Sequence, residues 1–307
     1  MPILPFSRKR PKPRLVGVGD LLQGFSIEVM PRTAAKIADF RAILPAGTMV
    51  YIAHIEGTEI NDMVATAKRL TDEGFRAMPH IPARIIKDRA EFETWLIRYA
   101  TEAGVDQALV LAGGPRVPAG DYHSTMQLLE SGLFDKHGYR RLHVAGHPEG
   151  NRDIDLDGST RLVDEAAQWK QAFAERTGVD MAMATQFAFD AGAVVKWAAR
   201  LKAAGVDLPI HVGVAGPAKL QTMIKFAIAC GVGPSLSVLQ KRAADVTRLL
   251  MPYEPGDVLS DLAAQVRDAD TNIAGVHFFP LGGINATAEW IANATAETRS
   301  EQGAAGA

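Results

Sequence analysis

The sequence predicts an α/β protein with a single-domain (βα)8 TIM barrel, on the basis of its length, its alternating apolar runs and the residues that end those runs. The chain has 307 residues, and a barrel of this kind needs roughly 250. Eight apolar runs of strand length alternate with amphipathic stretches of helix length, which is typical of βαβ units and a parallel sheet. No G-x-G-x-x-G follows the first run, which disfavours an open dinucleotide-binding sheet.

The predicted strands are nearly continuous in apolar residues, as expected of a sheet buried on both faces. They are 25–30, 49–54, 75–80, 108–112, 142–145, 181–187, 209–213 and 274–279. The predicted helices are 33–43, 59–73, 88–103, 123–134, 158–176, 190–204 and 217–229, with a longer excursion, 235–268, before the last strand. Gly104 and Gly178 end helices, because glycine accepts the left-handed backbone of a C-cap. Asp88 and Asp190 are expected N-caps.

We divide the chain into a basic, proline-rich arm at 1–20, a catalytic barrel at 21–295 and a flexible tail at 296–307. The arm is expected to be solvated, with binding of an anionic partner as the alternative. The formal charge of -2 gives no reason to expect nucleic acid as a partner. No stretch reaches the roughly 18 apolar residues of a membrane span, so no membrane partner is expected. The single cysteine, Cys230, excludes an intramolecular disulfide and favours a reducing, cytoplasmic location.

Polar side chains collect where the predicted strands end, and in a barrel these ends build the active site. Glu28 lies in the first strand and Gln186 in the sixth, while His54, His80 and His147 end or follow the second, third and fifth. The alternative for each histidine is a local hydrogen bond, and for Glu28 it is an ion pair on the surface. We expect burial to raise the pKa of Glu28 toward neutrality, which suits a general acid.

The three strand-end histidines could also be read as a zinc site, since three imidazoles are a common zinc set. No two of His54, His80 and His147 have the H-x-H or H-x-x-x-H spacing that would bring two ligands to one element. We therefore expect no metal. Gly113 and Gly114, at the end of the fourth strand, leave room for a ligand to approach the backbone.

Five segments resemble the methylenetetrahydrofolate reductases in order and in spacing, over almost the whole barrel. They are FSIEVMPR (25–32), PHIPAR (79–84), AGHPEG (145–150), ATQFAFD (184–190) and GVHFFPLGG (275–283). The first is similar to that family's F-E-F-F-P-P, the third to its A-x-Y-P-E and the last to its F-H-F-Y-T-L-N. The fourth is similar to its I-T-Q-x-x-F-D and is the most specific, because no general requirement of a barrel asks for Thr-Gln before an aromatic residue and an aspartate.

The resemblance implies hydride transfer from or to NAD(P)(H) that interconverts 5,10-methylenetetrahydrofolate and 5-methyltetrahydrofolate. Glu28 matches the acid that protonates N10 as the five-membered ring opens. Gln186 matches the amide that contacts the pterin, and Phe187, Leu220 and Phe279 fall on the substrate side. A folate and a nicotinamide nucleotide are therefore the expected partners. The sequence leaves open the direction of the reaction, the choice of NADH or NADPH, and a homo-oligomer.

The resemblance also implies FAD as a cofactor. Its contacts would come from His54, His80, Gly113, Gly114, Tyr122, His147 and Lys170. Several positions depart from the family: Ala112-Gly113-Gly114 replaces Arg-Gly-Asp, His147 replaces a tyrosine, and Asn151 replaces a histidine. Losing several contacts of about 1–3 kcal/mol each would weaken flavin binding. We expect either weak flavin binding through other contacts or direct hydride transfer from NAD(P)H without flavin.

Two other functions remain open from the sequence. One is a non-catalytic or accessory folate-binding barrel of a one-carbon or methyl-transfer system, which would bind the pterin without oxidising a nicotinamide. The other is a metal-dependent barrel lyase or hydrolase that uses the strand-end histidines.

Overall fold

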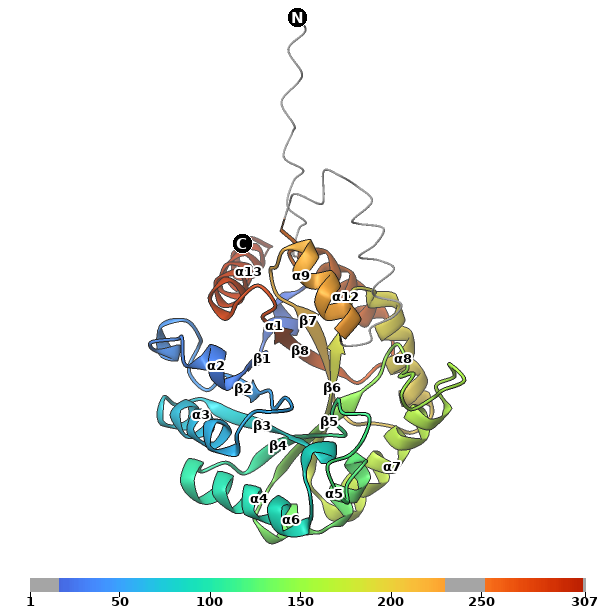
Figure 1. The fold of residues 1–307 in the computed structure, drawn as a ribbon. Helices are drawn as coiled ribbons and strands as arrows, with labels where there is room; N and C mark the ends of the chain where they lie inside the picture. The colour runs from blue at the N-terminus through green and yellow to red at the C-terminus, as the bar shows by residue number, and fades with distance from the viewer. Residues whose placement is uncertain (1–16, 230–251, 306–307) are drawn as a thin grey trace, which may run out of the picture.

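A computed structural model describes residues 17–229 and 252–305, so most of the expected basic arm, and Cys230, lie outside the described residues. Eight parallel strands pair in sequence order and close on themselves, which confirms the predicted (βα)8 barrel (Figure 1). The strands are β1 Ser26–Val29, β2 Met49–Ile52, β3 Arg76–Pro82, β4 Gln107–Leu111, β5 Arg141–Gly146, β6 Asp180–Phe187, β7 Ile210–Ala215 and β8 Ile273–Phe279.

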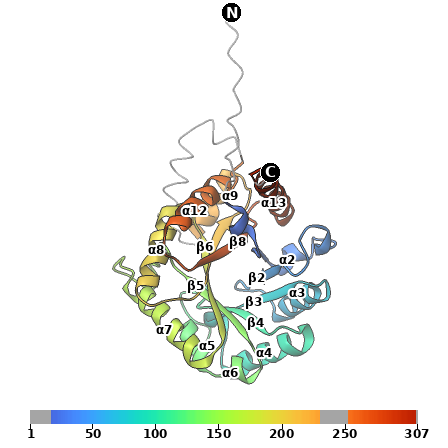
Figure 2. The same ribbon diagram turned by 180° about the vertical axis from the view of Figure 1, so that it is seen from behind.

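Helices surround the strands on all sides, and the view from behind shows the same ring (Figure 2). They are α1 Gly19–Leu22, α2 Pro31–Ala34, α3 Ile60–Asp72, α4 Arg89–Ala103, α5 Thr125–Glu130, α6 Leu133–Lys136, α7 Arg161–Thr177, α8 Ala191–Ala203, α9 Leu220–Ala229, α12 Gly256–Asp268 and α13 Ile284–Ala305, with 3-10 turns η1 Phe40–Ala42 and η2 Ala83–Ile85. None of the described helices is long and apolar enough to cross a membrane.

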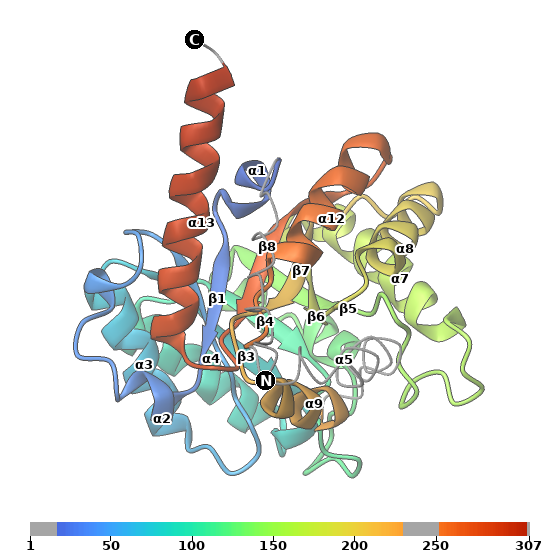
Figure 3. The ribbon, with the colours of Figure 1, turned by 90° about the horizontal axis from the view of Figure 1, so that it is seen from above.

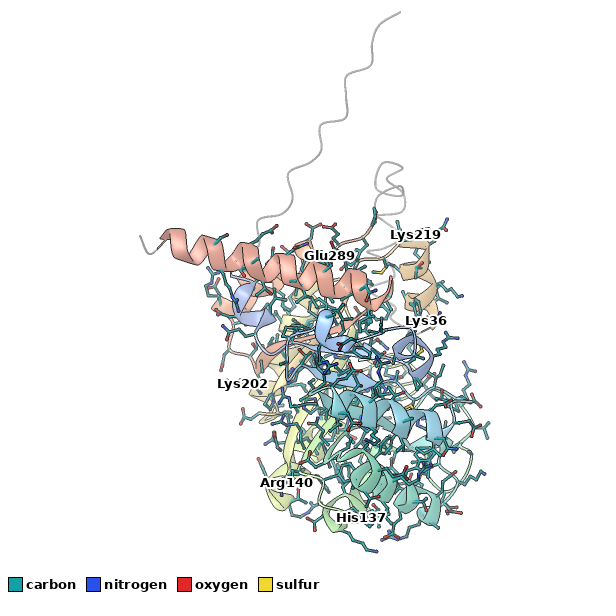
Figure 4. All side chains as sticks on the ribbon, turned by 90° about the vertical axis from the view of Figure 1, so that its left-hand side faces the viewer. Lys36, His137, Arg140, Lys202, Lys219 and Glu289 are labelled. Carbon is teal, nitrogen blue, oxygen red and sulfur yellow. The ribbon has the colours of Figure 1, made fainter. Side chains whose placement is uncertain are left out.

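The two ends of the barrel are distinct. Figure 3 shows α1 at one end and α9 at the other, with α13 running along the side of the barrel between them. In Figure 4, Arg140 and Lys202, which precede β5 and β7, lie on one side of the molecule, and Lys36 and Lys219, which follow β1 and β7, lie on the other. The second side therefore carries the carboxyl ends of the strands, where barrel enzymes place their active sites.

Alternation along each strand sorts the side chains into two layers. Outward residues such as Ile27, Val50 and Val110 are fully buried and belong to the main core between sheet and helices. Inward residues make a smaller apolar cluster inside the barrel, which consists of Met49, Tyr51, Met78, Leu109 and Ala184, with Leu111 packed against it.

The helix ends follow the local signals in the sequence. Asp88 caps α4 by accepting a hydrogen bond from the Glu91 amide at 2.8 Å, and Asp190 caps α8 through the Ala193 amide at 3.1 Å. Gly104 ends α4 in the left-handed region with φ 64°, a conformation that costs glycine little. These expected caps are confirmed.

Three expected elements differ from the structure. The predicted helix 33–43 is wrong, because only α2 and η1 form there. The carbonyl oxygens of Ala34 and Ile37 accept hydrogen bonds from the Arg69 guanidinium at 2.9 and 2.6 Å, and the Ala34 carbonyl also accepts one from the Ile37 amide at 3.0 Å. The predicted helix 123–134 is divided into α5 and α6 at Gly132, whose φ is 71°. Residues 296–305, expected as a flexible tail, continue α13.

Candidate functional site

Inward-facing side chains at the carboxyl half of the barrel form a polar site around Glu28. Its Oε2 lies 3.4 Å from Nε2 of His80 in β3 and 3.9 Å from Nε2 of His277 in β8. The Glu28 side chain is 20% exposed, while those of His80 and His277 are 11% and 2% exposed. Two imidazole nitrogens therefore face one carboxylate oxygen at the mouth of the barrel.

The pKa of Glu28 differs from the expectation. Burial raises it and is the largest single influence, but the contact with His277 and the charges of His80 and His277 together outweigh burial, so the pKa is lowered. Burial lowers the pKa of His80 to about 4, although the Glu28 charge acts in the opposite direction. The predicted rise of the Glu28 pKa is wrong, because the prediction considered desolvation without the two imidazoles. At neutral pH, Glu28 is a carboxylate beside a neutral His80.

A second group of inward polar residues lies deeper in the barrel. Nδ1 of His277 is 2.9 Å from the Ser26 hydroxyl, and the Tyr51 hydroxyl is hydrogen-bonded to Nδ1 of His143. His143 stacks on His211 of β7, with ring centroids 5.2 Å apart. All five side chains come from different strands, since the closed register brings β1, β2, β5, β7 and β8 around one axis.

Burial favours the neutral forms of Tyr51, His143 and His211. It raises the pKa of Tyr51 and lowers the pKa of His143 well below its ordinary value, assisted by the charges of His211 and Arg141. It also lowers the pKa of His211 to about 4. These side chains can therefore donate and accept hydrogen bonds while they remain uncharged.

Two of the predicted cofactor residues pack on the helix side of the barrel. The His54 ring lies 4.9 Å from that of Trp95 in α4, and its Nε2 is 3.1 Å from the Thr58 carbonyl oxygen. Tyr122 is buried and contacts Phe92, with ring centroids 5.9 Å apart. The structure does not bring either side chain to Glu28 as a hydrogen-bond or ion-pair partner.

Lys170 and His147 form a separate polar group at the carboxyl end of β5. Lys170 is only 5% exposed, and its Nζ donates to the Ala145 carbonyl at 3.2 Å. Burial lowers its pKa to about 8. Burial and the Lys170 charge lower the pKa of His147 to about 4, against the opposing charge of Asp155. A buried cation with one neutral partner is suited to an anionic group of a ligand.

The loop that follows β5 is held in place by Asp155, which is 2% exposed. Its carboxylate accepts hydrogen bonds from the amides of Leu162 and Val163 at 2.8 and 3.1 Å. Asn151, where the resemblance has a histidine, accepts a hydrogen bond from the Asp153 amide at 2.9 Å. The Asn151 oxygen is thus used to shape the loop.

Apolar side chains line the part of the mouth where β6, β7 and β8 end. Phe187, Leu220 and Phe279 belong to one cluster, and the rings of Phe187 and Phe279 meet edge to face at 5.5 Å. The Phe279 ring also contacts His277, at 4.8 Å. Three of the predicted substrate residues are therefore adjacent to each other and to the group around Glu28.

Gln186 lies in an irregular part of β6, where the register to β7 shifts between Ala184 and Phe187. Its side-chain oxygen accepts a 3.2 Å hydrogen bond from the Phe187 amide. The close approach of Gly213 fixes this segment, because a Cβ at Gly213 would lie 2.5 Å from the Thr185 carbonyl oxygen and 2.6 Å from the Gln186 backbone. A bulge next to a site commonly redirects a side chain.

The loop after β4 presents backbone at the mouth. Gly113 has φ 93° and a Cβ there would meet Pro82 at 3.0 Å, while Gly114 has open space around it. The Ala112 carbonyl accepts a 2.8 Å hydrogen bond from the Arg84 amide. The Arg84 guanidinium is itself used by the Pro115 and His123 carbonyls.

Within the described ranges, no three His, Cys, Asp or Glu side chains are grouped so that they could hold a metal ion. His54 contacts Trp95 and the Thr58 carbonyl, and His147 lies near Lys170 and Asp155. The alternative of a metal site built from strand-end histidines therefore has no support in this part of the chain.

Sequence reasoning missed Tyr51, His143, His211 and His277. When a strand is apolar on both faces, the sequence does not show which residues face the barrel interior. The polar residues in the middle of these strands were therefore not predicted as site residues. The period of two along a strand could have found His277, because it is two residues before Phe279, a predicted substrate residue.

No protein-family model matches the chain. One solved structure of similar fold is an uncharacterized protein from Clostridium thermocellum that binds two copies of 5-methyl-5,6,7,8-tetrahydrofolic acid. It aligns with a TM-score of 0.55 and 13% identity over 93% of this chain and 100% of that chain. Yersinia pestis DHPS with a pterine-sulfa conjugate aligns with a TM-score of 0.44 and 16% identity over 91% and 95%. The first likeness extends to the fold alone, and the second is too distant to support an inference.

Proposed function

We propose that this barrel interconverts 5,10-methylenetetrahydrofolate and 5-methyltetrahydrofolate by hydride transfer from or to NAD(P)(H), with Glu28 as the acid–base residue at N10. The observation that carries the proposal is the position of Glu28. It lies in β1 at the carboxyl end of the barrel, and Nε2 of His80 and of His277 face its Oε2. This is the position that the resemblance to the methylenetetrahydrofolate reductases assigns to the acid.

The lowered pKa of Glu28 defines its part in each direction of the reaction. In the oxidative direction, hydride leaves the methyl carbon, N10 bonds to that carbon, and the carboxylate accepts the N10 proton. In the reductive direction, Glu28 must first take up a proton and then give it to N10 as the bond from N10 to carbon breaks. A pterin seated on the mouth would remove the remaining water from Glu28, and this desolvation would raise its pKa and favour proton uptake.

In this proposal, the pterin contacts Gln186 and the apolar side chains where β6, β7 and β8 end. Phe187 and Phe279 offer ring faces and edges beside the acid, and Leu220 packs in the same cluster. Gln186 has both an amide donor and an amide acceptor, which match the mixed donor and acceptor edge of a pterin. The similar fold of a protein that binds 5-methyltetrahydrofolic acid also favours a folate in this barrel.

The described residues fit a flavin poorly. Of the side chains expected to hold FAD, His54 contacts Trp95 and Tyr122 contacts Phe92. The guanidinium of Arg84, which donates into the loop after β4, is bonded to the backbone carbonyls of His123 and Pro115. Lys170 is the cation left to meet a phosphate among the positions named for the cofactor. We therefore assign no step to flavin and propose that hydride passes directly between nicotinamide and folate.

The test is an absorbance assay of the purified chain with methylenetetrahydrofolate and NADH or NADPH, with and without added FAD. Nicotinamide oxidation without FAD is the expected result. A stoichiometric flavin chromophore in the purified protein, or turnover only after FAD is added, would overturn the flavin-free part of the proposal. Absence of turnover with either nucleotide would overturn the reductase assignment.

A second candidate is a folate-binding barrel without reductase activity. The observation that favours it is the lowered pKa of Glu28, since the free protein then holds no proton on this residue at neutral pH. Titration with 5-methyltetrahydrofolate by calorimetry distinguishes the two. Binding of this folate without any nicotinamide oxidation supports the second candidate.

A further inference from the structure

His80 in β3 has a buried ring nitrogen, Nε2, with no hydrogen-bond partner among the described residues. The charged atom that faces it is Oε2 of Glu28, 3.4 Å away. This separation is slightly longer than an N–H···O hydrogen bond, which requires about 3.2 Å or less. Buried polar atoms without a partner are uncommon in folded proteins. The Glu28 carboxylate is therefore the group with which His80 can complete its hydrogen bonding.

The backbone and a neighbouring ring fix the direction of the His80 side chain. Met78, two residues earlier, belongs to the cluster inside the barrel, whereas Ile81 belongs to the core outside it. Because side chains alternate along a strand, His80 faces inward. The backbone is paired to β4 at this residue, through His80↔Leu109, and the Tyr51 ring meets the His80 ring edge to face, with centroids 6.1 Å apart. The imidazole is thus held opposite Glu28.

The charge of Glu28 decides which nitrogen of His80 carries the proton. Burial lowers the pKa of His80 to about 4, so the ring is neutral at pH 7 and has a single N–H. If the proton were on Nδ1, the lone pair of Nε2 would face a negatively charged oxygen. With the proton on Nε2, the ring directs a donor at Oε2 and the two groups attract each other. The expected form of His80 is therefore the Nε2–H tautomer.

The two oxygens of the Glu28 carboxylate have different surroundings. Nε2 of His80 and Nε2 of His277 both approach Oε2, at 3.4 and 3.9 Å. The second separation is too long for a hydrogen bond, so His80 is the nearer donor and the His277 ring lies on the same side of the carboxylate. Oε1 is therefore the oxygen that remains for a ligand at the mouth.

We propose that His80 is a positioning residue that binds Oε2 of Glu28 through its Nε2–H and leaves Oε1 to exchange a proton with N10 of the folate. This role rests on the reductase function proposed above, and it differs from the cofactor contact that the resemblance implies for His80. The imidazole acts through Glu28 and does not touch the folate. The contact of 3.4 Å should shorten when a ligand covers the mouth, because hydrogen bonds of catalytic groups often tighten in the complex.

The proton that is transferred is the one on Oε1, and His80 keeps its own. In the reductive direction, the bond between N10 and the methylene carbon breaks with its electron pair on N10. N10 takes the proton of Oε1, the carbon takes hydride from the reduced nicotinamide, and the nicotinamide is oxidised. Glu28 is left as a carboxylate, and the Nε2–H of His80 stabilises its charge. The oxidative direction reverses these steps.

His80→Phe and His80→Gln distinguish loss of the donor from loss of the ring. Phenylalanine has no N–H, whereas the glutamine amide can place one near the position of Nε2. Both variants keep His277, the other residue whose charge acts on Glu28, and Tyr51, its neighbour in β2. Loss of the donor disfavours the carboxylate and raises the pKa of Glu28.

We expect the limb of the kcat/KM profile that Glu28 sets to move up by about one pH unit in His80→Phe and to stay near its wild-type position in His80→Gln. In His80→Phe, kcat should also fall about tenfold, because the carboxyl group loses its orientation, while KM for the folate stays unchanged. Wild-type rates and pH profile in His80→Phe, together with loss of turnover in Glu28→Gln, would overturn the role of His80 and leave the reductase function intact. An equal shift in both His80 variants would also overturn it, because loss of the ring would then suffice.

His137→Phe is the matched control. His137 lies at the end of α6 and forms another histidine–glutamate pair, with its Nε2 2.9 Å from Oε1 of Glu93 in α4. It is far along the molecule from Lys36 and Lys219, which mark the side of the mouth (Figure 4). The variant should keep the wild-type rate and pH profile. A shift equal to that of His80→Phe would overturn the proposal, because loss of any histidine beside a glutamate would then suffice.

NMR of the free protein tests the pairing without turnover. Histidine 15N spectra report which ring nitrogen of His80 carries the proton, and the 13C signal of the Glu28 carboxyl group reports its titration. We expect the proton on Nε2 in the wild type and a Glu28 titration at higher pH in His80→Phe. A proton on Nδ1 of His80, or the same titration in both proteins, would overturn the proposal. Absence of turnover in the wild type would instead overturn the reductase function, and with it the transfer at Oε1.

Discussion

Glu28 and His80 face each other across the mouth of the barrel, with Oε2 of the carboxylate 3.4 Å from Nε2 of the imidazole. The pair joins β1 to β3 over the intervening β2. Both pKa values are lowered, so the pair carries one negative charge at neutral pH. A charged acid beside a neutral imidazole can either accept a proton or hold a donor group of a ligand.

Replacing Glu28 by Gln removes the titrating group and keeps its shape. We expect turnover to fall by about 10²–10⁴-fold, the usual contribution of a general acid or base, while folate affinity changes little. Steady-state kinetics and calorimetry measure the two quantities. Glu130→Gln, at an exposed site on α5, is the matched control and should be unaffected. A rate in Glu28→Gln close to that of the wild type would refute the assignment.

Acid should destabilise the fold through His80. Its pKa is about 4 in the folded state against 6.5 for the free side chain, so below about pH 6.5 the unfolded chain binds a proton that the folded chain refuses. Stability is therefore lost as the pH falls, by about 2 kcal/mol between pH 7 and pH 5 from this residue. Urea unfolding of wild type and His80→Asn at both pH values tests this. An equal loss in both proteins would contradict it.

Gly213→Ala should damage the pterin side of the site. The new Cβ would meet the backbone of Thr185 and Gln186 at 2.5 to 2.6 Å, and backbone cannot move aside as a flexible side chain can. We expect the free energy of unfolding to fall by about 1–3 kcal/mol, with weaker folate binding. Gly275→Ala, whose Cβ would have only ordinary contacts at 3.8 Å, is the control for stability. Equal stability of the two variants would show that the clash at β6 does not matter.

Lys170→Met separates a binding role of the lysine from a structural one. Burial of the Lys170 charge costs free energy and lowers the pKa of Lys170 to about 8. We therefore expect the free energy of unfolding of the variant at pH 7 to be unchanged or about 1 kcal/mol higher than that of the wild type. Affinity for the nicotinamide nucleotide should fall about tenfold, since a hydrogen bond to a charged group contributes about 1.5–3 kcal/mol. Fluorescence titration measures the affinity. A destabilised variant with normal affinity would assign the lysine to the fold.

The barrel could be predicted from the sequence because local signals and the overall pattern agree. Apolar runs gave all eight strands, and Asp88, Gly104 and Asp190 cap or end helices as expected. The predicted helix 33–43 does not form, and this segment instead contacts Arg69, more than thirty residues away, which donates to the Ala34 and Ile37 carbonyls. Long-range contacts of this kind leave no mark in a local window.

The candidate site could be predicted only in part. Glu28 and His80 were found because they stand where strands end, and Phe187 and Phe279 because a resemblance placed them on the substrate side. The strength of the Glu28 acid was not predictable, since it depends on His277 in the last strand. The direction of the His54 side chain was equally hidden, because Trp95 of α4 provides its surroundings.

The seam of the barrel has a consequence for dynamics. β1 pairs with β8 through Ser26↔His277 and Ile27↔Phe278 only, so this joint has fewer backbone pairs than the others and should be among the first to open. Opening would withdraw His277 from both Ser26 and Glu28. A ligand that bridges β1 and β8 would hold this joint closed, so hydrogen exchange at Ile27 and Phe278 should become slower as occupancy of the mouth increases.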